Sequence, residues 1–282
     1  MGQDMLAPEP YNTLCTMAAR GLIPIVTGGP NCRTWSILRW FPKPGAPKPV
    51  RGRSEEQVWG LPGLTPKDQE DVDNDSTLLL RQMYLTSLAY QGVASQTIPH
   101  CPGSFLEHPS DPKETSKSPN AHRCSTIWNT KAYQHWAKTL RHRQVKFDQC
   151  QLGQLVAKST TLSTDLDLGH WTGMICDHPG HPKLADIASS DLSRYPWKMM
   201  KGLAQAIAIR ARPILQNPTP GLQVELGQHQ PMKGGDSPSP TRSMYTSQSS
   251  PAGMTPEHTT SATRSNPATK EPPALSGKGS LE

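Results

Sequence analysis

The sequence predicts an α/β domain, a sheet with flanking helices, followed by a disordered tail. Near the N-terminus, apolar residues at helical spacing precede a short apolar run and a Gly-rich turn. Helix-like and strand-like patterns then alternate until about residue 210. After Pro213 the chain becomes rich in Pro, Ser, Thr, Gly and Gln without periodicity, so it cannot bury enough apolar surface to order. We therefore expect a folded domain over residues 1–215 and a disordered tail over 216–282.

The composition predicts a modest core for a chain of 282 residues. Only 34% of the residues are apolar, below the roughly 45–50% of globular domains, and 29 are proline. The net charge of +6 permits a polyanionic partner such as DNA without requiring one.

The first helix and strand are predicted from the stretch "YNTLCTMAARGLIPIVTGG". Leu14 and Ala18 share a helical face, and Gly21 can end the helix. Residues 22–26 then form a short apolar strand, although Pro24 has no N–H to give to a central strand.

A basic, Pro-rich segment covers residues 33–53 and contains no acidic residue. One interpretation is a solvated loop. The other is an arm that follows phosphates, with Trp35, Trp40 and Phe41 able to stack on bases. The predicted nucleic-acid-binding residues are Arg33, Arg39, Lys43, Lys48, Arg51 and Arg53.

The longest helix is predicted within residues 64–91, with Thr65 as its N-cap and Pro66 in its first turn. We expect a strand at 103–109, a polar loop at 109–126, a helix over 128–140, strands at 145–152 and 159–166, and a helix over 196–209. The apolar face of the long helix is predicted from Val72, Leu79, Met83, Leu80, Tyr84 and Leu88, and Met199, Leu203 and Ile207 are expected to be buried in the last helix. The row Trp128, Tyr133 and Trp136 favours core packing over a base-stacking platform.

The six cysteines predict free thiols in a reducing compartment, because the N-terminus lacks the features of a secretory signal. No apolar run reaches the roughly 18 residues that span a bilayer, so no membrane partner is expected. These patterns indicate an intracellular protein and are compatible with a nuclear one.

The stretch "GGPNCRTWS", residues 28–36, follows the first predicted strand. Open α/β folds bind ligands at the carboxyl edge of the sheet, where Cys32 would lie. A thiol at that edge can act as a nucleophile if its pKa falls. The alternative is a tight turn that holds a structural cysteine.

This stretch resembles the Pro-Cys motif of the DNA cytosine-5 methyltransferases, and "FLEHP" resembles the strand that carries their catalytic Glu. The order strand–Cys, helix, strand–Glu is that of the family. The stretches "FDQCQLGQLVAKSTTLSTDL" and "SRYPWKMMKGLAQAIAI" look like the closing segments of divergent methyltransferase-like proteins associated with mobile elements. The resemblance covers about residues 14–210 and implies a partial Rossmann-like, class I methyltransferase-like sheet.

The resemblance implies catalytic roles for two residues. Cys32 would add to C6 of a flipped-out cytosine, and Glu107 would contact the N3 edge and stabilise the adduct. Arg33 and Arg39 would contact the phosphates of the target. Thr34 and Ser36 would fix the conformation of the loop that carries Cys32.

The family binds S-adenosylmethionine through a Gly-rich turn and an acidic residue upstream of the Pro-Cys motif. Only 27 residues precede Gly28, and they contain no such turn. We therefore expect the donor site to be missing, its residues to be unknown, and no methyl transfer by this chain. Without the early strands of the family, the first strand of this chain would lie at a sheet edge. Its unpaired backbone groups could then bind a protein partner that completes the sheet.

A second class of function stays open: a non-enzymatic nucleic-acid- or partner-binding protein derived from a mobile element. A gene fragment without a selected function is a third interpretation. A Cys-His hydrolase is disfavoured, because Glu107 and its neighbour His108 point to opposite faces of one strand.

"CDHPGHP" places Cys176, His178 and His181 within six residues, with Asp177 and Asp186 nearby. A zinc site needs four ligands. Only distant residues such as Cys101, Cys124 or His170 could supply the fourth, so the sequence favours a polar loop and no metal is expected.

Overall fold

The computed structural model describes residues 4–40, 47–95, 102–182 and 194–216. The chain divides into two units, Met1–Gly227 and Gln228–Glu282, and every described residue belongs to the first. The predicted tail at 216–282 falls, apart from Gln216, outside the described residues. No helix in the described part of the chain combines the length and the apolar character that crossing a membrane requires.

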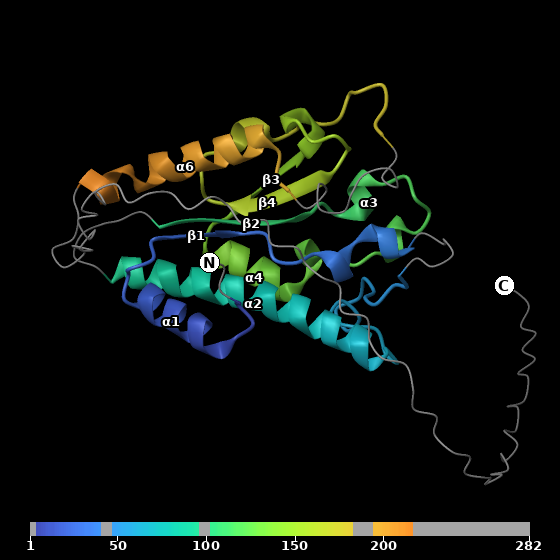
Figure 1. The fold of residues 1–282 in the computed structure, drawn as a ribbon, viewed down its shortest axis with the longest axis horizontal. Coiled ribbons are helices and arrows are strands. Elements are labelled where there is room, and N and C mark those ends of the chain that lie inside the picture. The colour runs from blue at the N-terminus through green and yellow to red at the C-terminus, as the bar shows by residue number, and fades with distance from the viewer. Residues whose placement is uncertain (1–3, 41–46, 96–101, 183–193, 217–282) are drawn as a thin grey trace, which may run out of the picture. The chain divides into compact units, whose positions relative to one another are not determined.

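The first unit is an α/β fold built on a mixed four-stranded sheet with flanking helices, as the sequence predicts (Figure 1). The strand order is β1-β2-β4-β3. Strand β1 runs parallel to β2, whereas β4 lies between β2 and β3 and is antiparallel to both. In chain order the elements are α1 (Pro8–Ala19), β1 (Ile25–Gly28), η1 (Arg33–Trp35), η2 (Ile37–Trp40), α2 (Pro66–Ala94), β2 (Gly103–Pro109), α3 (Pro112–Thr115), η3 (Ala121–Arg123), η4 (Ile127–Asn129), α4 (Lys131–Thr139), β3 (Arg143–Asp148), η5 (Gln149–Leu152), β4 (Ser159–Thr164), η6 (Gly169–Trp171) and α6 (Trp197–Gln216).

Helices cover both faces of the sheet. Helix α6 lies on one face, and α1, α2 and α4 lie on the other (Figure 1). Alternation along β2 assigns Phe105 to the α6 side, where it packs in a cluster with Met199. Leu106 points the other way and packs with Leu79 of α2 and Trp136 of α4.

The ends of α1 and α2 follow their local sequence signals. Gly21 has a φ of 72° after α1, and its N–H donates to the Ala18 carbonyl while the Leu22 N–H donates to that of Met17. This is the Gly-dependent helix end that the sequence predicts. At the start of α2 the Thr65 hydroxyl accepts a hydrogen bond from the Asp68 N–H, so Thr65 is the predicted N-cap.

Two strands have bounds that differ from the predicted ones, one beside a proline and one beside a turn. The first strand begins at Ile25 rather than at residue 22, because Pro24 has no N–H for the ladder. The third strand ends at Asp148 rather than at 152, since the chain turns into η5, which closes at Gly153 with a φ of 102°.

The long helix buries a narrower face than predicted. Val72, Leu79 and Met83 are buried, but Leu80 and Tyr84 are exposed, because the sheet and α1 cover one side of α2 only. Met199 and Leu203 of α6 are buried, and Ile207 is partly buried against the same cluster. Trp128, Tyr133 and Trp136 belong to the core, which confirms the packing interpretation.

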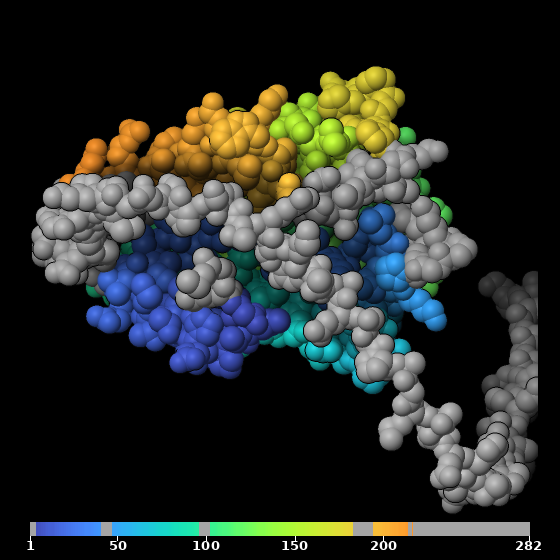
Figure 2. All heavy atoms as spheres, in the orientation of Figure 1, coloured from blue at the N-terminus to red at the C-terminus, as the bar shows by residue number. Residues whose placement is uncertain are grey.

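The surfaces of α1 and α6 lie on opposite sides of the described domain (Figure 2). The outer face of α6 carries apolar side chains, with Trp197 71% exposed and Ile209 62% exposed. Helix α6 also continues to Gln216, beyond the predicted end at 209, and includes Pro213.

Candidate functional site

Cys32 lies just beyond the carboxyl end of β1, at the N-cap of η1. Its carbonyl accepts a hydrogen bond from the Trp35 N–H at 3.0 Å. The Asn31 side-chain oxygen accepts from the Arg33 N–H at 3.2 Å, which is the local bond of an Asx turn. Asn31 therefore shapes the turn at the position where the resembled motif has a second proline.

Gly29 lets the backbone pass directly against Glu107. A Cβ at this position would lie 2.7 Å from Glu107 Oε2 and closer still to the Tyr195 hydroxyl. No larger residue fits without moving these groups, so the Gly-Gly pair serves close approach.

Glu107 is carried by β2, the parallel neighbour of β1, with Gly28 and Leu106 as register partners. Its side chain is buried, and Oε2 accepts a hydrogen bond of 3.1 Å from the Tyr195 hydroxyl. Oε1 has no partner among the described residues. A buried carboxyl oxygen without a partner costs free energy unless a ligand satisfies it.

Burial raises the pKa of both reactive groups. Burial raises the pKa of Glu107, and the positive charge of Lys158 opposes part of that rise. Burial also raises the pKa of the Cys32 thiol, and the nearby Glu107 carboxyl raises it further. The pair therefore presents a carboxyl group whose protonated form is favoured by burial and a thiol that must lose its proton before it attacks.

A pocket of about 300 Å³ opens beside Cys32, at the lower end of the range for small-molecule sites. Lys158, which precedes β4, is part of its wall. Glu107 is not among the described residues that line it, and its Oε2 lies close to Gly29. The lining residues are Cys32, Trp35, Ser36, Ile37, Leu38, Pro109, Ser110, Pro112, Thr115, Ser116, Val156, Ala157, Lys158 and Ser159.

The turn after Cys32 is anchored to the interior by Thr34. Its backbone N–H and its hydroxyl both donate to Asp75 Oδ2, at 3.0 and 2.6 Å. The Arg51 Nε donates to the Thr34 hydroxyl at 2.9 Å, and the Arg51 guanidinium lies over the Trp35 ring, 4.0 Å from its centroid. The sequence assigned Thr34 this loop-setting role.

Several of the predicted phosphate-binding residues are engaged inside the protein. Arg51 and Arg39 are buried. Arg39 donates to the carbonyls of Arg33 and Lys48. Arg53 forms a two-pronged ion pair with Asp111, with a shortest distance of 2.5 Å.

The other members of that set differ in exposure. Arg33 is half exposed and pairs with Asp71 at 2.6 Å, and Lys48 is exposed. Lys43 lies outside the described residues, as does Phe41. Phosphate binding by the 33–53 segment stays a prediction, and Arg33 and Lys48 are its surface-accessible described members.

His108 lies on the opposite side of β2 from Glu107, as the alternation predicts. It packs between Trp35 and Trp128, with ring centroids 5.5 and 6.2 Å away. Complete burial lowers its pKa to about 3, so it is a neutral core residue.

Tyr195 and Lys158 were not predicted as site residues. Tyr195 approaches Glu107 from the segment before α6, and Lys158 approaches from the turn before β4. Only the pairing of β4 with β2 brings Lys158 near, and no local signal marks either residue.

Comparisons of the chain with protein-family models, curated proteins and solved structures find no match.

The substitution Glu107→Gln is expected to stabilise the protein at pH 8 by on the order of 1 kcal/mol and to have less effect at pH 5. Because burial raises the folded-state pKa of Glu107 above its unfolded value, folding favours the protonated form. The wild type therefore loses stability as the pH rises from the unfolded pKa through the folded one, and the amide does not. Urea unfolding at the two pH values measures this difference.

The matched control is Glu70→Gln, which removes an exposed carboxyl on α2. If Glu107→Gln and Glu70→Gln change the free energy of unfolding alike at both pH values, the burial argument is wrong.

Proposed function

We propose that Cys32 and Glu107 form a base-addition site like that of the DNA cytosine-5 methyltransferases. The observation that carries the proposal is that Cys32 follows the carboxyl end of β1 and Glu107 lies on β2, the adjacent parallel strand, with an Oε1 that has no partner among the described residues. A thiol next to a buried carboxylic acid matches the two groups that addition to cytosine requires.

The proposed step is the addition of the Cys32 thiol to the cytosine ring. The Cys32 thiol loses its proton to water, and its sulfur forms a bond to C6 of the cytosine. The π electrons of the C5–C6 bond form a C4–C5 double bond, the π electrons of the N3–C4 bond move onto N3, and N3 takes the proton of Glu107. The Glu107 carboxylate then recovers a proton from solvent. The net change is the addition of the thiol to the base, with the sulfur on C6 and the hydrogen on N3.

The neighbours of Glu107 suit this role. The Tyr195 hydroxyl occupies Oε2 and leaves Oε1 for the base edge. The positive charge of Lys158 interacts with both Glu107 and Cys32, so it favours the thiolate that must form and the carboxylate left after proton transfer.

The described residues do not fit the methyl donor of this family. A groove of about 450 Å³ beside β1 is lined by Gly28, Gly29, Asn31 and apolar residues of α1, β1 and α2. Its described lining contains Arg81 but no acidic side chain, whereas acidic residues commonly bind the ribose hydroxyls of nucleoside cofactors. We therefore propose base addition and no transfer from S-adenosylmethionine by this chain.

Covalent capture tests the proposal. DNA in which 2-pyrimidinone replaces cytosine is the probe, because the missing amino group makes C6 more electrophilic and no methyl donor is needed. The full chain is expected to form a denaturation-resistant complex with this DNA. The complex should be lost in Cys32→Ser, reduced at least about 100-fold in rate in Glu107→Gln, and retained in Cys15→Ser.

Absence of a Cys32-dependent complex in a chain that binds the same DNA would refute the addition chemistry. DNA binding that weakens steeply with salt and ignores Cys32→Ser would favour the non-enzymatic alternative. Calorimetric binding of S-adenosylmethionine by this chain would overturn the donor argument.

A further inference from the structure

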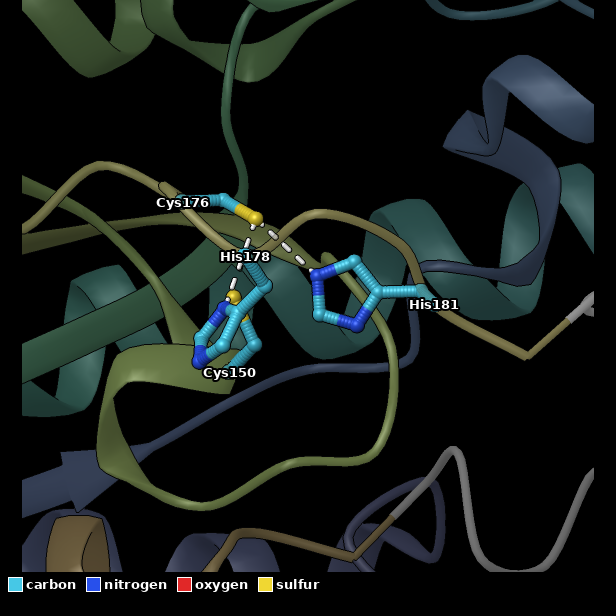
Figure 3. A group of neighbouring side chains, drawn as sticks. All are labelled: Cys150, Cys176, His178 and His181. Atoms are coloured by element: carbon cyan, nitrogen blue, oxygen red, sulfur yellow. Dashed lines mark hydrogen bonds between the residues drawn. The ribbon is translucent and has the colours of Figure 1, made fainter.

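A second cluster of reactive side chains lies away from Cys32. It consists of Cys150, from η5, and Cys176, His178 and His181, from the segment after η6 (Figure 3). The four potential ligand atoms lie within 4.8 Å of one another. Cys150 is the fourth ligand that the sequence did not supply, because η5 and the 176–181 segment meet only in the folded chain.

The spacing of these atoms suits one small ion. Cys176 Sγ lies 3.6 Å from His178 Nδ1 and 2.9 Å from His181 Nε2. Zinc–sulfur bonds of about 2.3 Å and zinc–nitrogen bonds of about 2.0–2.1 Å place tetrahedral ligand atoms roughly 3.3–3.8 Å apart. The longer of the two measured distances lies within this range and the other is shorter, and all four atoms lie within 4.8 Å of one another.

The surrounding contacts hold the ligands in place. His181 Nδ1 lies 3.0 Å from the Leu155 carbonyl, so a proton on Nδ1 leaves Nε2 free to bind a metal. The Cys176 N–H donates to Asp148 Oδ2 at 2.7 Å. The Gln151 amide donates to the Ile175 carbonyl and to Asp177 Oδ1, at 2.8 and 2.7 Å.

We propose that Cys150, Cys176, His178 and His181 bind one Zn²⁺ ion in a closed, structural Cys₂His₂ site. A tetrahedral set of two sulfurs and two nitrogens is typical of zinc, and four protein ligands leave no open position for a substrate. This proposal differs from the sequence expectation of a polar loop without metal.

The ion would join three segments. Cys150 follows β3, the 176–181 segment follows η6, and Leu155 belongs to the turn that leads to Lys158. The site would therefore fix the turn that carries Lys158 toward Glu107, yet zinc binding does not depend on the function proposed for Cys32.

The two cysteine thiols of the cluster differ in pKa when no metal ion is bound. Hydrogen bonds with His181 and His178 lower the pKa of Cys176 to about 6, whereas burial and the neighbouring Cys176 raise that of Cys150 to about 11. A bound divalent cation deprotonates both thiols.

Metal content and cobalt substitution test the proposal on the full chain. The reduced protein from zinc-supplemented expression is expected to hold one zinc per chain. After chelation, Co²⁺ should give the visible bands of a tetrahedral site and a thiolate-to-cobalt charge-transfer band, and zinc should abolish both. Cys176→Ser and His181→Gln should each weaken cobalt affinity by at least about 100-fold.

Cys15→Ser and His170→Gln are the matched controls, since they change a thiol and an imidazole outside the cluster and should leave the affinity unchanged. Because the cobalt spectrum is measured on the wild type, the test does not depend on how the variants fold. A reduced wild-type chain that takes up neither metal would overturn the proposal, as would a spectrum without thiolate bands. A Cys150–Cys176 disulfide whose reduction does not restore metal uptake would also overturn it.

Discussion

Arg51→Met is expected to lower the free energy of unfolding by about 3 kcal/mol or more. Arg51 is 1% exposed, and its guanidinium donates to the Val58 and Val72 carbonyls and to the Thr34 and Ser76 hydroxyls. Burial lowers its pKa to about 10, and the negative charge of Asp75 opposes that fall. Without the arginine, the Val58 carbonyl loses its side-chain donor, the Val72 carbonyl and the two hydroxyls each lose one partner, and Asp75 loses its compensating charge. Chemical denaturation followed by tryptophan fluorescence measures the loss.

Lys48→Met is the matched control, because it removes an exposed positive charge from the same basic segment. It should change the free energy of unfolding by no more than about 0.5 kcal/mol. Arg51→Lys should recover only part of the loss, since one ammonium cannot reproduce the planar fork. If Arg51→Met and Lys48→Met are equally stable, Arg51 does not organise the core and a surface role is favoured.

Gly92→Ala is expected to destabilise the protein by about 1–3 kcal/mol, although alanine is the better helix former by about 1 kcal/mol. A Cβ on Gly92 of α2 would collide with the Ala18 carbonyl oxygen and approach the Ala19 oxygen within 2.9 Å. Both atoms belong to the backbone of α1, so the helices must separate. Thermal unfolding, with the helix content followed by circular dichroism, measures the effect.

The control for Gly92→Ala is Gln91→Ala, on the exposed side of the same turn. This change should stay within about 0.5 kcal/mol of the wild type. A Gly92→Ala protein more stable than the wild type would show that α1 does not pack as closely as the structure places it.

The elements predicted well from the sequence are those with local signals. The strand 103–109 is found with the predicted bounds, and the long helix starts at the predicted Thr65 cap. The strand–Cys, helix, strand–Glu order produces adjacent parallel strands, but Glu107 is not among the described residues that line the pocket beside Cys32. These features depend on short stretches whose turn residues and apolar pattern agree.

The features that the sequence could not predict depend on contacts between distant residues. In the sequence, Arg51 and Lys48 are both basic residues of one segment, and nothing local separates a buried one from an exposed one. Arg51 is buried because it donates to Thr34, which in turn donates to Asp75 of the distant helix α2. The sequence predicts Cys150 as part of the strand 145–152. In the structure it belongs to η5, which places its thiol near that of Cys176. The hydrogen bond from Tyr195 to Glu107 likewise joins segments that no local pattern relates.

The interior position of β4 has a consequence for assembly on the ribosome. Strand β4 is the last of the described strands in sequence, yet it joins β2 to β3. During synthesis from the N-terminus, β1 and β2 can pair only as a two-stranded ribbon, and such ribbons are marginal in water. The nascent chain therefore cannot complete its sheet until residue 164 has left the exit tunnel, and its early apolar surfaces stay open to chaperones until then.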